Sequence, residues 1–348
     1  MLNYKKISLY ILFVLSLFLG FILQENSSGG AKIDHNFFQT YINFFYLDFY
    51  DGLEKFLENP AAIIQLPVFY IIISFFLKIT DNLVALKFGY ILICSFLPLI
   101  FFLILKRKFK FEKEFLFYLS LLIFLSPYFR TSSIWLLGDN LSLIFISLSI
   151  LFFLKFQDEK KIFDLYLFFI FLILCSYIRH YYSFFIIYYL FYVYKNLNLK
   201  HLFYLTFLSF ILALPALIYL KYIILNYNFI DTISSFSNTN YLSSGFIILT
   251  IILFYLIPFI INREFVIFSY YKEKIKTLLF ITLITFFIYI IDIFFFKNLI
   301  IFPTNGGGVF VKLIYQVSPI LRETLLFIVF LISFLDINAI GSFFYIYI

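Results

Sequence analysis

One polar stretch separates the first apolar run of the chain from everything that follows: ENSSGGAKIDHNFFQTYINFFYLDFYDGLEKFLENP, residues Glu25–Pro60. It holds six acidic and two basic residues, a charge of −4 in a chain whose formal net charge is +7. Aromatic residues lie between the acids, and the stretch carries His35, one of three histidines. Because the rest of the chain is mostly apolar, we expect any chemistry to be concentrated here.

The composition indicates the class of protein. Of the 348 residues 64% are hydrophobic and 13% are charged, and the mean hydropathy is +1.03. Such a chain cannot give a soluble domain a polar surface, so we predict an all-α, polytopic integral membrane protein. We expect the basic excess to set the membrane topology. Nucleic acid is not an expected partner, because its binding requires a basic face that this chain lacks.

The alternation of apolar runs with basic connections predicts about ten spans in one transmembrane domain, residues 1–348. By the positive-inside rule, the basic cluster Lys106–Lys113 and the N-terminal lysines are expected in the cytoplasm. The first run, Ile7–Leu23, is expected to be an uncleaved helix; a cleaved signal peptide is the alternative. Residues Gln24–Ala62 then form an external acidic loop lying on the membrane. We expect the protein to lie in a bacterial inner membrane, with its active site on the external face.

The segment Ala61–Leu77 is apolar but interrupted by Gln65 and Pro67, and we expect that it does not fully span. The apolar C-terminal residues, Gly341–Ile348, are compatible with a short last helix or with a truncated, inactive protein. The remaining predicted spans are Leu83–Leu105, Phe115–Leu125, Leu141–Leu154, Leu165–Tyr177, Tyr182–Tyr194, Leu202–Leu220, Phe246–Ile261 and Leu278–Phe296.

The first candidate site is Ile33–Tyr41, a short distance beyond the first apolar run. A carboxylate held at a membrane surface, here Asp34, can act as general base toward the hydroxyl group of a sugar or lipid. The alternative is that Asp34 is a solvated acid without a chemical role.

Two further candidates lie at predicted helix ends. Arg130 offers a planar fork for a phosphate group, or else anchors the chain among lipid headgroups. Asp139 opens the next helix, where a carboxylate either contributes to a site or caps the helix. Arg179 and His180 form a basic pair at the external end of a helix. Ionisable residues there are often functional, and snorkelling to the interface is the alternative.

A fourth candidate is the run Gly306–Gly308, followed by Lys312 and Arg322. Three glycines allow backbone amides to approach a phosphate group closely. A plain flexible external loop is the alternative.

The order of these features resembles the GT-C class of polytopic glycosyltransferases, in which a first helix precedes an external segment that opens with an acid. The resemblance is greatest to the lipid-linked-oligosaccharide α-1,2-glucosyltransferases, where an acidic pair is followed by a glutamine, as Asp34 is followed by Gln39. Here His35 stands in place of the second acid. Pro60 and Pro67 are separated, whereas the corresponding prolines of the family are adjacent.

The resemblance implies transfer of a sugar from a polyprenyl-phosphate donor to a glycan or lipid-linked acceptor. Asp34 is the expected catalytic base. No cofactor is expected; a divalent metal is compatible with the reaction, but no ligand cluster of clear spacing indicates one. The cysteines, Cys94 and Cys175, also lack such spacing. The alternative function is a transporter or lipid-linked-sugar flippase without catalysis, which would predict inverted repeats. The expected substrate-binding residues are His35, Gln39, Arg130, Asp139, Arg179, His180, Lys312 and Arg322.

Overall fold

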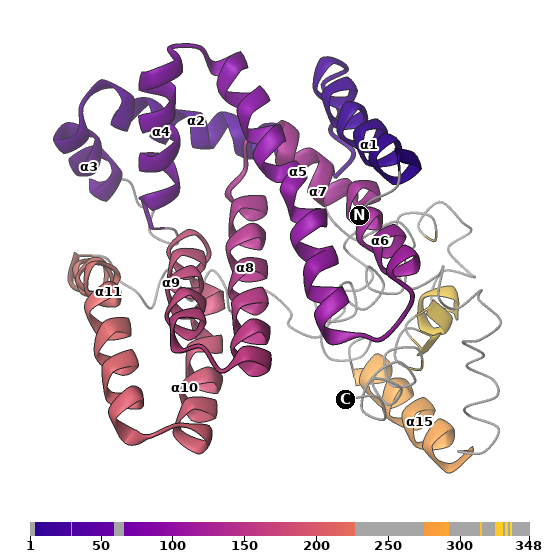
Figure 1. The fold of residues 1–348 in the computed structure, drawn as a ribbon. Coiled ribbons are helices and arrows are strands. Elements are labelled where there is room, and N and C mark those ends of the chain that lie inside the picture. Colours follow the sequence, from indigo (N-terminus) through magenta and orange to yellow (C-terminus); the bar gives the residue numbers. More distant parts are fainter. Residues whose placement is uncertain are drawn as a thin grey trace. The chain divides into compact units, whose positions relative to one another are not determined.

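The computed structural model describes residues 4–28, 30–58, 66–226 and 275–291, with short helical pieces at 314, 324–329, 331–332 and 335. The chain divides into two compact units, Met1–Asn228 and Phe229–Ile348. Every regular element in the described ranges is a helix, which confirms the prediction of an all-α protein (Figure 1). In the second unit the principal described element is α15 (Ile275–Ile291), where Phe286 packs edge-on against Phe327.

Four helices in the first unit are long and apolar enough to cross a membrane: α1 (Tyr4–Ile22), α5 (Leu83–Lys108), α8 (Gly138–Glu159) and α11 (Leu199–Asn226). At about 1.5 Å per residue, the 26 residues of α5 extend about 39 Å, more than the roughly 30 Å of a hydrocarbon core. These helices are compatible with the predicted polytopic membrane protein. The finer prediction of about ten spans is not confirmed.

A fifth crossing exists if a bent pair of helices counts as one span. The first arm consists of α6 (Lys113–Leu121) with the 3₁₀ turn η2 (Leu122–Leu125), and the second arm is α7 (Pro127–Ile134). The two arms meet at 62°. Ser126 and Pro127 produce the break: the Ser126 hydroxyl accepts from the Phe129 amide at 3.3 Å, and proline is favoured in the first turn of a helix.

The first unit also has shorter apolar helices: α4 (Val68–Thr80), α9 (Ile162–Ile178) and α10 (Phe184–Asn196). The 13 residues of α4 extend about 20 Å, in keeping with the prediction that this segment does not fully span. The expected span Tyr182–Tyr194 corresponds to α10, also 13 residues, which is too short to cross by itself. The expected span Phe246–Ile261 lies outside the described residues.

The expected acidic loop over Gln24–Ala62 is largely helical instead, which corrects the prediction for this segment. It contains α2 (Ala31–Leu47) and α3 (Phe49–Glu58). The aromatic residues that accompany the acids recur at helical spacing and bury one face of α2. The buried residues on that face are Ala31, His35, Phe38, Tyr41, Ile42 and Phe45.

Two local features turn the chain back between α2 and α3. The carboxylate of Asp48 accepts from the amides of Tyr50 at 2.8 Å and Asp51 at 2.9 Å, so it caps the start of α3. A Cβ atom on Gly52 would lie 2.8 Å from the carbonyl oxygen of Phe44, so only glycine allows the two helices to approach this closely. The acids that suggested a loop are therefore partly capping residues.

Within the first unit, α8 packs between α5 and α9 (Figure 1). Helix α1 contacts α5 and α7, whereas α2 packs on α3 and α4, and both α10 and α11 contact α9. One buried cluster joins α1, α2, α4, α5, α7 and the start of α8, and a second joins the rest of α8 with α9, α10 and the start of α11. The first cluster surrounds the segments that carry most of the candidate residues.

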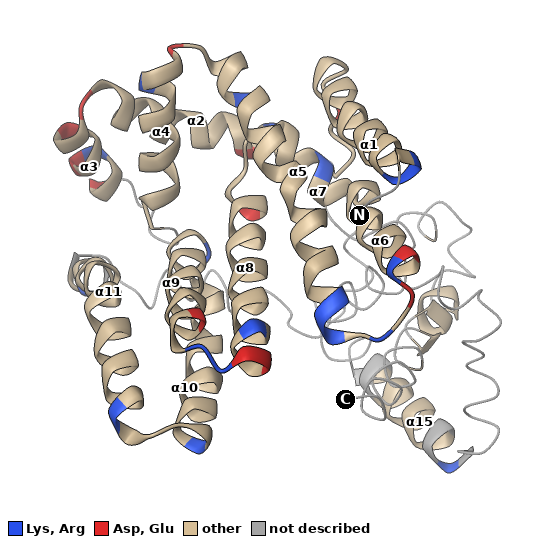
Figure 2. Cartoon of the chain, in the orientation of Figure 1, with Lys and Arg blue, Asp and Glu red and all other residues tan. Residues whose placement is uncertain are grey.

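Basic residues lie at one end of the helices of this unit, where α5 passes to α6, α8 to α9, and α10 to α11 (Figure 2). Arg107, near the end of α5, pairs with Asp158 at 2.8 Å and Glu159 at 3.3 Å, near the end of α8. Lys6 pairs with Glu114 at 2.6 Å, which brings the N-terminus to the start of α6. The 22 residues of α8 extend about 33 Å, so Asp139 lies that far from this basic end.

Candidate functional site

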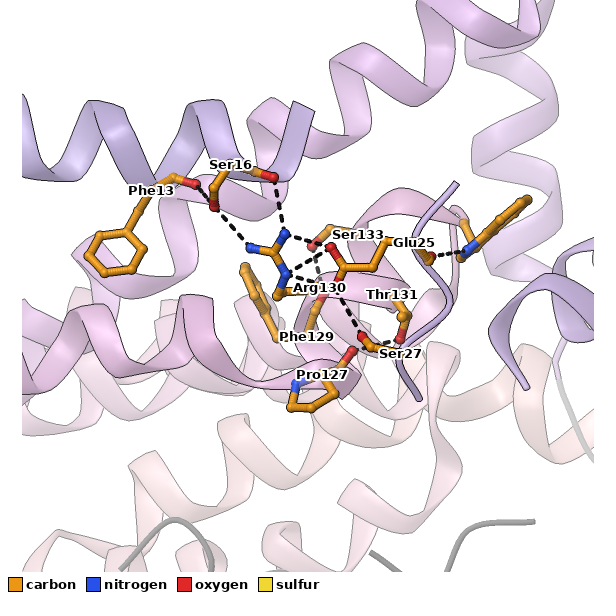
Figure 3. Close-up of polar contacts among 10 residues, drawn as sticks. Phe13, Ser16, Glu25, Ser27, Pro127, Phe129, Arg130, Thr131 and Ser133 are labelled. Carbon is orange, nitrogen blue, oxygen red and sulfur yellow. Dashed lines mark hydrogen bonds and ion pairs between the residues drawn. The ribbon is translucent and has the colours of Figure 1, made fainter. Parts of the chain in front are cut away.

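The end of α1 is fastened to α7 by an ion pair, Glu25–Arg130, which we call the clamp (Figure 3). The Arg130 Nε donates to both carboxylate oxygens of Glu25, at 2.8 and 3.0 Å, and Nη2 donates to Oε2 at 2.6 Å. Nη1 and Nη2 also donate to the hydroxyl and carbonyl oxygens of Ser16, at 2.9 and 3.0 Å. Ser27 donates to Glu25 Oε1 at 2.9 Å. All three guanidinium nitrogens of Arg130 are therefore engaged.

The clamp lies in a partly buried position, with the side chains of Arg130 and Glu25 18% and 22% exposed. The hydrogen bond from Arg130 holds the pKa of the Glu25 carboxyl below its usual value, although burial acts in the opposite direction. A Cβ atom on Gly20 would lie 2.5 Å from Glu25 Oε2, so the clamp needs glycine at this position of α1. To bind a phosphate group, Arg130 would have to release Glu25.

Helix α7 ends in a tight turn that directs the chain into α8. Leu136 adopts the left-handed conformation at φ 57°, and the Leu137 amide donates back to the Ser132 carbonyl at 3.0 Å. This is the pattern of a Schellman motif, here with leucine where glycine is usual. The hydroxyl of Tyr90, on α5, donates to the Leu137 carbonyl and secures the turn.

The turn delivers Asp139 to the first turn of α8, next to the end of α9. A Cβ atom on Gly138 would lie 3.1 Å from Ile178 Cγ2, which shows how closely the two helix ends approach. Arg179 follows α9 directly, and its Nη2 lies 2.8 Å from Asp139 Oδ1. Arg179 is 17% exposed and Asp139 is 43% exposed, so the carboxylate is the more accessible partner. The Arg179 Nε is buried without a hydrogen-bond partner in the described part of the chain.

Asp34, on the first turn of α2, is an exposed residue with a partly desolvated carboxyl group, and it lies within electrostatic range of this pair. Burial raises the pKa of the Asp34 carboxyl, the negative charge of Asp139 raises it further, and the Arg179 cation opposes both effects. A carboxylate with a raised pKa is a stronger base toward a hydroxyl group. The structure thus brings together three of the predicted site residues: Asp34 on α2, Asp139 on α8 and Arg179 directly after α9.

The other predicted residues lie elsewhere. Gln39 is half-buried and lies about 140° around α2 from Asp34, because five positions separate them. His180 begins the short 3₁₀ turn η3 (His180–Ser183) and is exposed. Arg130 is engaged in the clamp, and His35 faces Trp135. Lys312 and Arg322 lie outside the described residues, so their roles stay predictions.

His35 is buried at 2% exposure beside the indole of Trp135, with ring centroids 5.8 Å apart. Burial and the nearby Lys87 cation lower the pKa of the imidazole to about 4. A backbone hydrogen bond to Trp135 acts in the opposite direction and raises this pKa. The ring is therefore neutral near pH 7. The Trp135 Nε1 donates to the backbone carbonyl of Glu25 at 2.8 Å, so Trp135 supports the clamp from the other side.

Sequence reasoning did not identify Glu25, Trp135 or Lys87 as parts of a functional region. The available signals were that Glu25 is the first acid after the opening apolar run and that Trp135 is the sole tryptophan of the chain. Within the described ranges, no group of three or more histidine, cysteine and acidic side chains is placed to hold a metal ion. No protein family, curated protein or solved structure matches this chain at a significant level.

Proposed function

We propose that the protein is a membrane glycosyltransferase that transfers a sugar from a polyprenyl-phosphate donor to a glycan or lipid-linked acceptor. The observation that carries the proposal is the juxtaposition of Asp34, a carboxylate with a raised pKa, with the Asp139–Arg179 pair. Glycosyl transfer from such a donor requires a base for the acceptor hydroxyl and a cation for the departing phosphate. This group of residues supplies one of each.

In the proposed reaction, Asp34 takes the proton of the acceptor hydroxyl as its oxygen bonds to the anomeric carbon of the sugar. The bond from that carbon to the phosphate oxygen breaks, and the electron pair leaves with the polyprenyl phosphate. Arg179 stabilises the negative charge of the departing phosphate. Asp139 holds Arg179 by one nitrogen and leaves the Nε available for a new partner.

We place the Asp34 end of the first unit outside the cytoplasm. Lysine and arginine gather at the opposite helix ends, and basic connections are retained on the cytoplasmic side of a bacterial inner membrane (Figure 2). The polyprenyl chain of the donor would then lie in the bilayer beside the apolar helices, with its phosphate at the external surface.

The test measures sugar transfer by the purified protein. Polyprenyl-phosphate hexoses serve as donors, membrane extract supplies the acceptor, and released polyprenyl phosphate is the readout. Asp34→Asn removes the base and is expected to lower the rate by about 10²–10⁴. Asp51→Asn is the matched control: Asp51 is exposed on α3 and pairs with Lys55 at 2.6 Å, a contact of little energetic value. Undiminished transfer by Asp34→Asn would refute the assigned base, and no transfer by wild-type protein would favour a transporter or flippase.

A second test separates a phosphate-binding Arg179 from an interfacial anchor. Arg179→Lys keeps the charge but loses the planar fork, so donor binding is expected to weaken, and Arg179→Gln is expected to weaken it further. Binding is measured in the Asp34→Asn background to prevent turnover. Arg107→Lys is the control, because Arg107 pairs with acids at the opposite end of the unit. Equal donor affinity with arginine and lysine at position 179 would remove this residue from the site.

A further inference from the structure

Two lysine side chains from different helices meet at the indole ring of Trp135. The Nζ of Lys32, on the first turn of α2, lies 5.5 Å from the ring centroid, and the Nζ of Lys87, near the start of α5, lies 5.1 Å from it. Both distances are within the range of a cation–π interaction. Trp135 itself is 8% exposed, so the indole is a fixed surface on which the two ammonium groups rest.

Neither ammonium group is neutralised by a carboxylate in the described part of the chain. Lys32 has one polar contact, with Gln24 Oε1 at 3.4 Å, and Lys87 has no hydrogen-bonded or ion-paired partner there. Glu25, seven positions before Lys32, gives both of its oxygens to the clamp. Asp34 lies about 160° around α2 from Lys32, on the side of Arg179. Two cations near one ring repel each other, and an anion bound between or beside them would reduce this repulsion.

Two further features strengthen the positive potential here. The N-terminus of α2 has no side-chain cap, so the dipole of the helix adds partial positive charge next to Lys32. His35 lies one turn from Lys32 on the same side of α2, contacts the indole, and has a buried Nδ1 without a partner in the described ranges. A buried polar atom of this kind ordinarily has a hydrogen-bond partner, and an anionic ligand with a protonated oxygen would supply one.

We propose that Lys32 and Lys87, held against Trp135, bind a phosphate group. The place in the fold favours phosphate over other anions: Lys87 lies about one turn inside the start of the candidate span α5, and lysine side chains near span ends reach the level of the lipid headgroups. The phosphate is carried either by a lipid or by a soluble compound. The site is separate from Asp34 and Arg179 and does not depend on the proposed glycosyl transfer.

The experiment uses the full chain in neutral detergent. Because Trp135 is the sole tryptophan, selectively excited tryptophan emission reports on this site alone. The protein is titrated with short-chain phosphatidylglycerol, with polyprenyl monophosphate and with inorganic phosphate, and equilibrium dialysis measures the bound amount independently of emission. Saturable binding of either lipid but not of inorganic phosphate identifies a lipid source, and binding of inorganic phosphate identifies a soluble one.

The substitutions decide whether the lysines are responsible. Lys32→Gln and Lys87→Gln are each expected to weaken binding by about tenfold or more, since each removes a charge-assisted contact. Lys32→Arg and Lys87→Arg keep the charge and are expected to retain binding. Lys55→Gln is the matched control, because Lys55 also lies over an aromatic ring, that of Phe44 at 5.8 Å, but has Asp51 as a partner. No saturable binding of any probe by the wild-type protein, or equal binding by the glutamine variants and this control, would overturn the proposal.

Discussion

The clamp gives the sharpest prediction, because its geometry fixes both the size and the sign of the effect. Glu25→Gln removes the charge that faces Arg130, and Arg130→Gln removes the charge that faces Glu25. Each change leaves a charged partner at roughly one-fifth exposure. Loss of one member of a buried pair costs about 3–5 kcal/mol, so for this partly buried, doubly hydrogen-bonded pair we expect each variant to lose about 3 kcal/mol of unfolding free energy.

The double variant Glu25→Gln with Arg130→Gln discriminates further, because it leaves no unpaired charge. Two neutral amides of similar size can hydrogen-bond to each other, and we expect the double variant to lose clearly less than the sum of the two single losses, by about 2–3 kcal/mol. The free energy of unfolding is measured by titrating detergent-solubilised protein with dodecyl sulfate and following helix content. The control pair is Asp51→Asn with Lys55→Gln, an exposed i, i+4 pair for which we expect a coupling of less than about 0.5 kcal/mol.

Additive losses for Glu25 and Arg130 would refute the structural role of the clamp. So would wild-type stability of Arg130→Gln combined with loss of donor binding. That second result would restore Arg130 as a phosphate ligand.

Three other predictions follow from individual residues. His35 has a folded-state pKa of about 4 against an ordinary 6.5, so its contribution to stability is present above pH 6.5 and is lost as the pH falls toward 4, by up to about 3 kcal/mol. The test compares the unfolding free energies of wild type and His35→Phe across this pH range, and parallel curves would contradict the prediction. Gly20→Ala puts a Cβ atom 2.5 Å from the clamp carboxylate and is expected to lower the free energy of unfolding by about 1–3 kcal/mol. Gly89→Ala is the control, because a Cβ atom at Gly89 meets nothing within 4 Å, and it is expected to be harmless in the same unfolding assay. Single cysteines are introduced at the exposed positions Asn26 and Lys110 in a background without the two native cysteines. On intact cells an impermeant thiol reagent is expected to label the cysteine at position 26 and not the one at position 110, and the reverse pattern would invert the proposed orientation.

The helical class and the long apolar helices could be predicted because they depend on local composition. The expected span Leu83–Leu105 corresponds to α5, Leu83–Lys108, and the basic residues that end it are visible in any reading of the sequence. The prediction of a loop over Gln24–Ala62 is wrong where α2 and α3 lie, because acidic residues occur in helices as well as in loops. Asp48 instead caps a helix, and the aromatic residues of α2 recur with helical spacing.

The contacts of the site could not be predicted in the same way, because they join distant positions. Glu25 and Arg130 are 105 positions apart, and a single sequence does not indicate that these two charges are partners. Arg130 and Arg179 look alike in sequence: each is a lone arginine near an expected external helix end. The structure distinguishes them by what surrounds each guanidinium group.

The capacity of each cation to bind an anion follows from the donors that the protein leaves unused. Arg130 engages every guanidinium nitrogen within the clamp, so an incoming phosphate would compete with a carboxylate already in place. Arg179 has one ion pair, with a partner that is 43% exposed, and a buried Nε without a partner in the described residues. Lys87 has no anionic partner there. Because an occupied donor stabilises the fold and an unoccupied buried donor is costly until a ligand arrives, substitutions should separate into two classes. Changes at Arg130 should alter stability before binding, whereas changes at Arg179 and Lys87 should alter binding before stability.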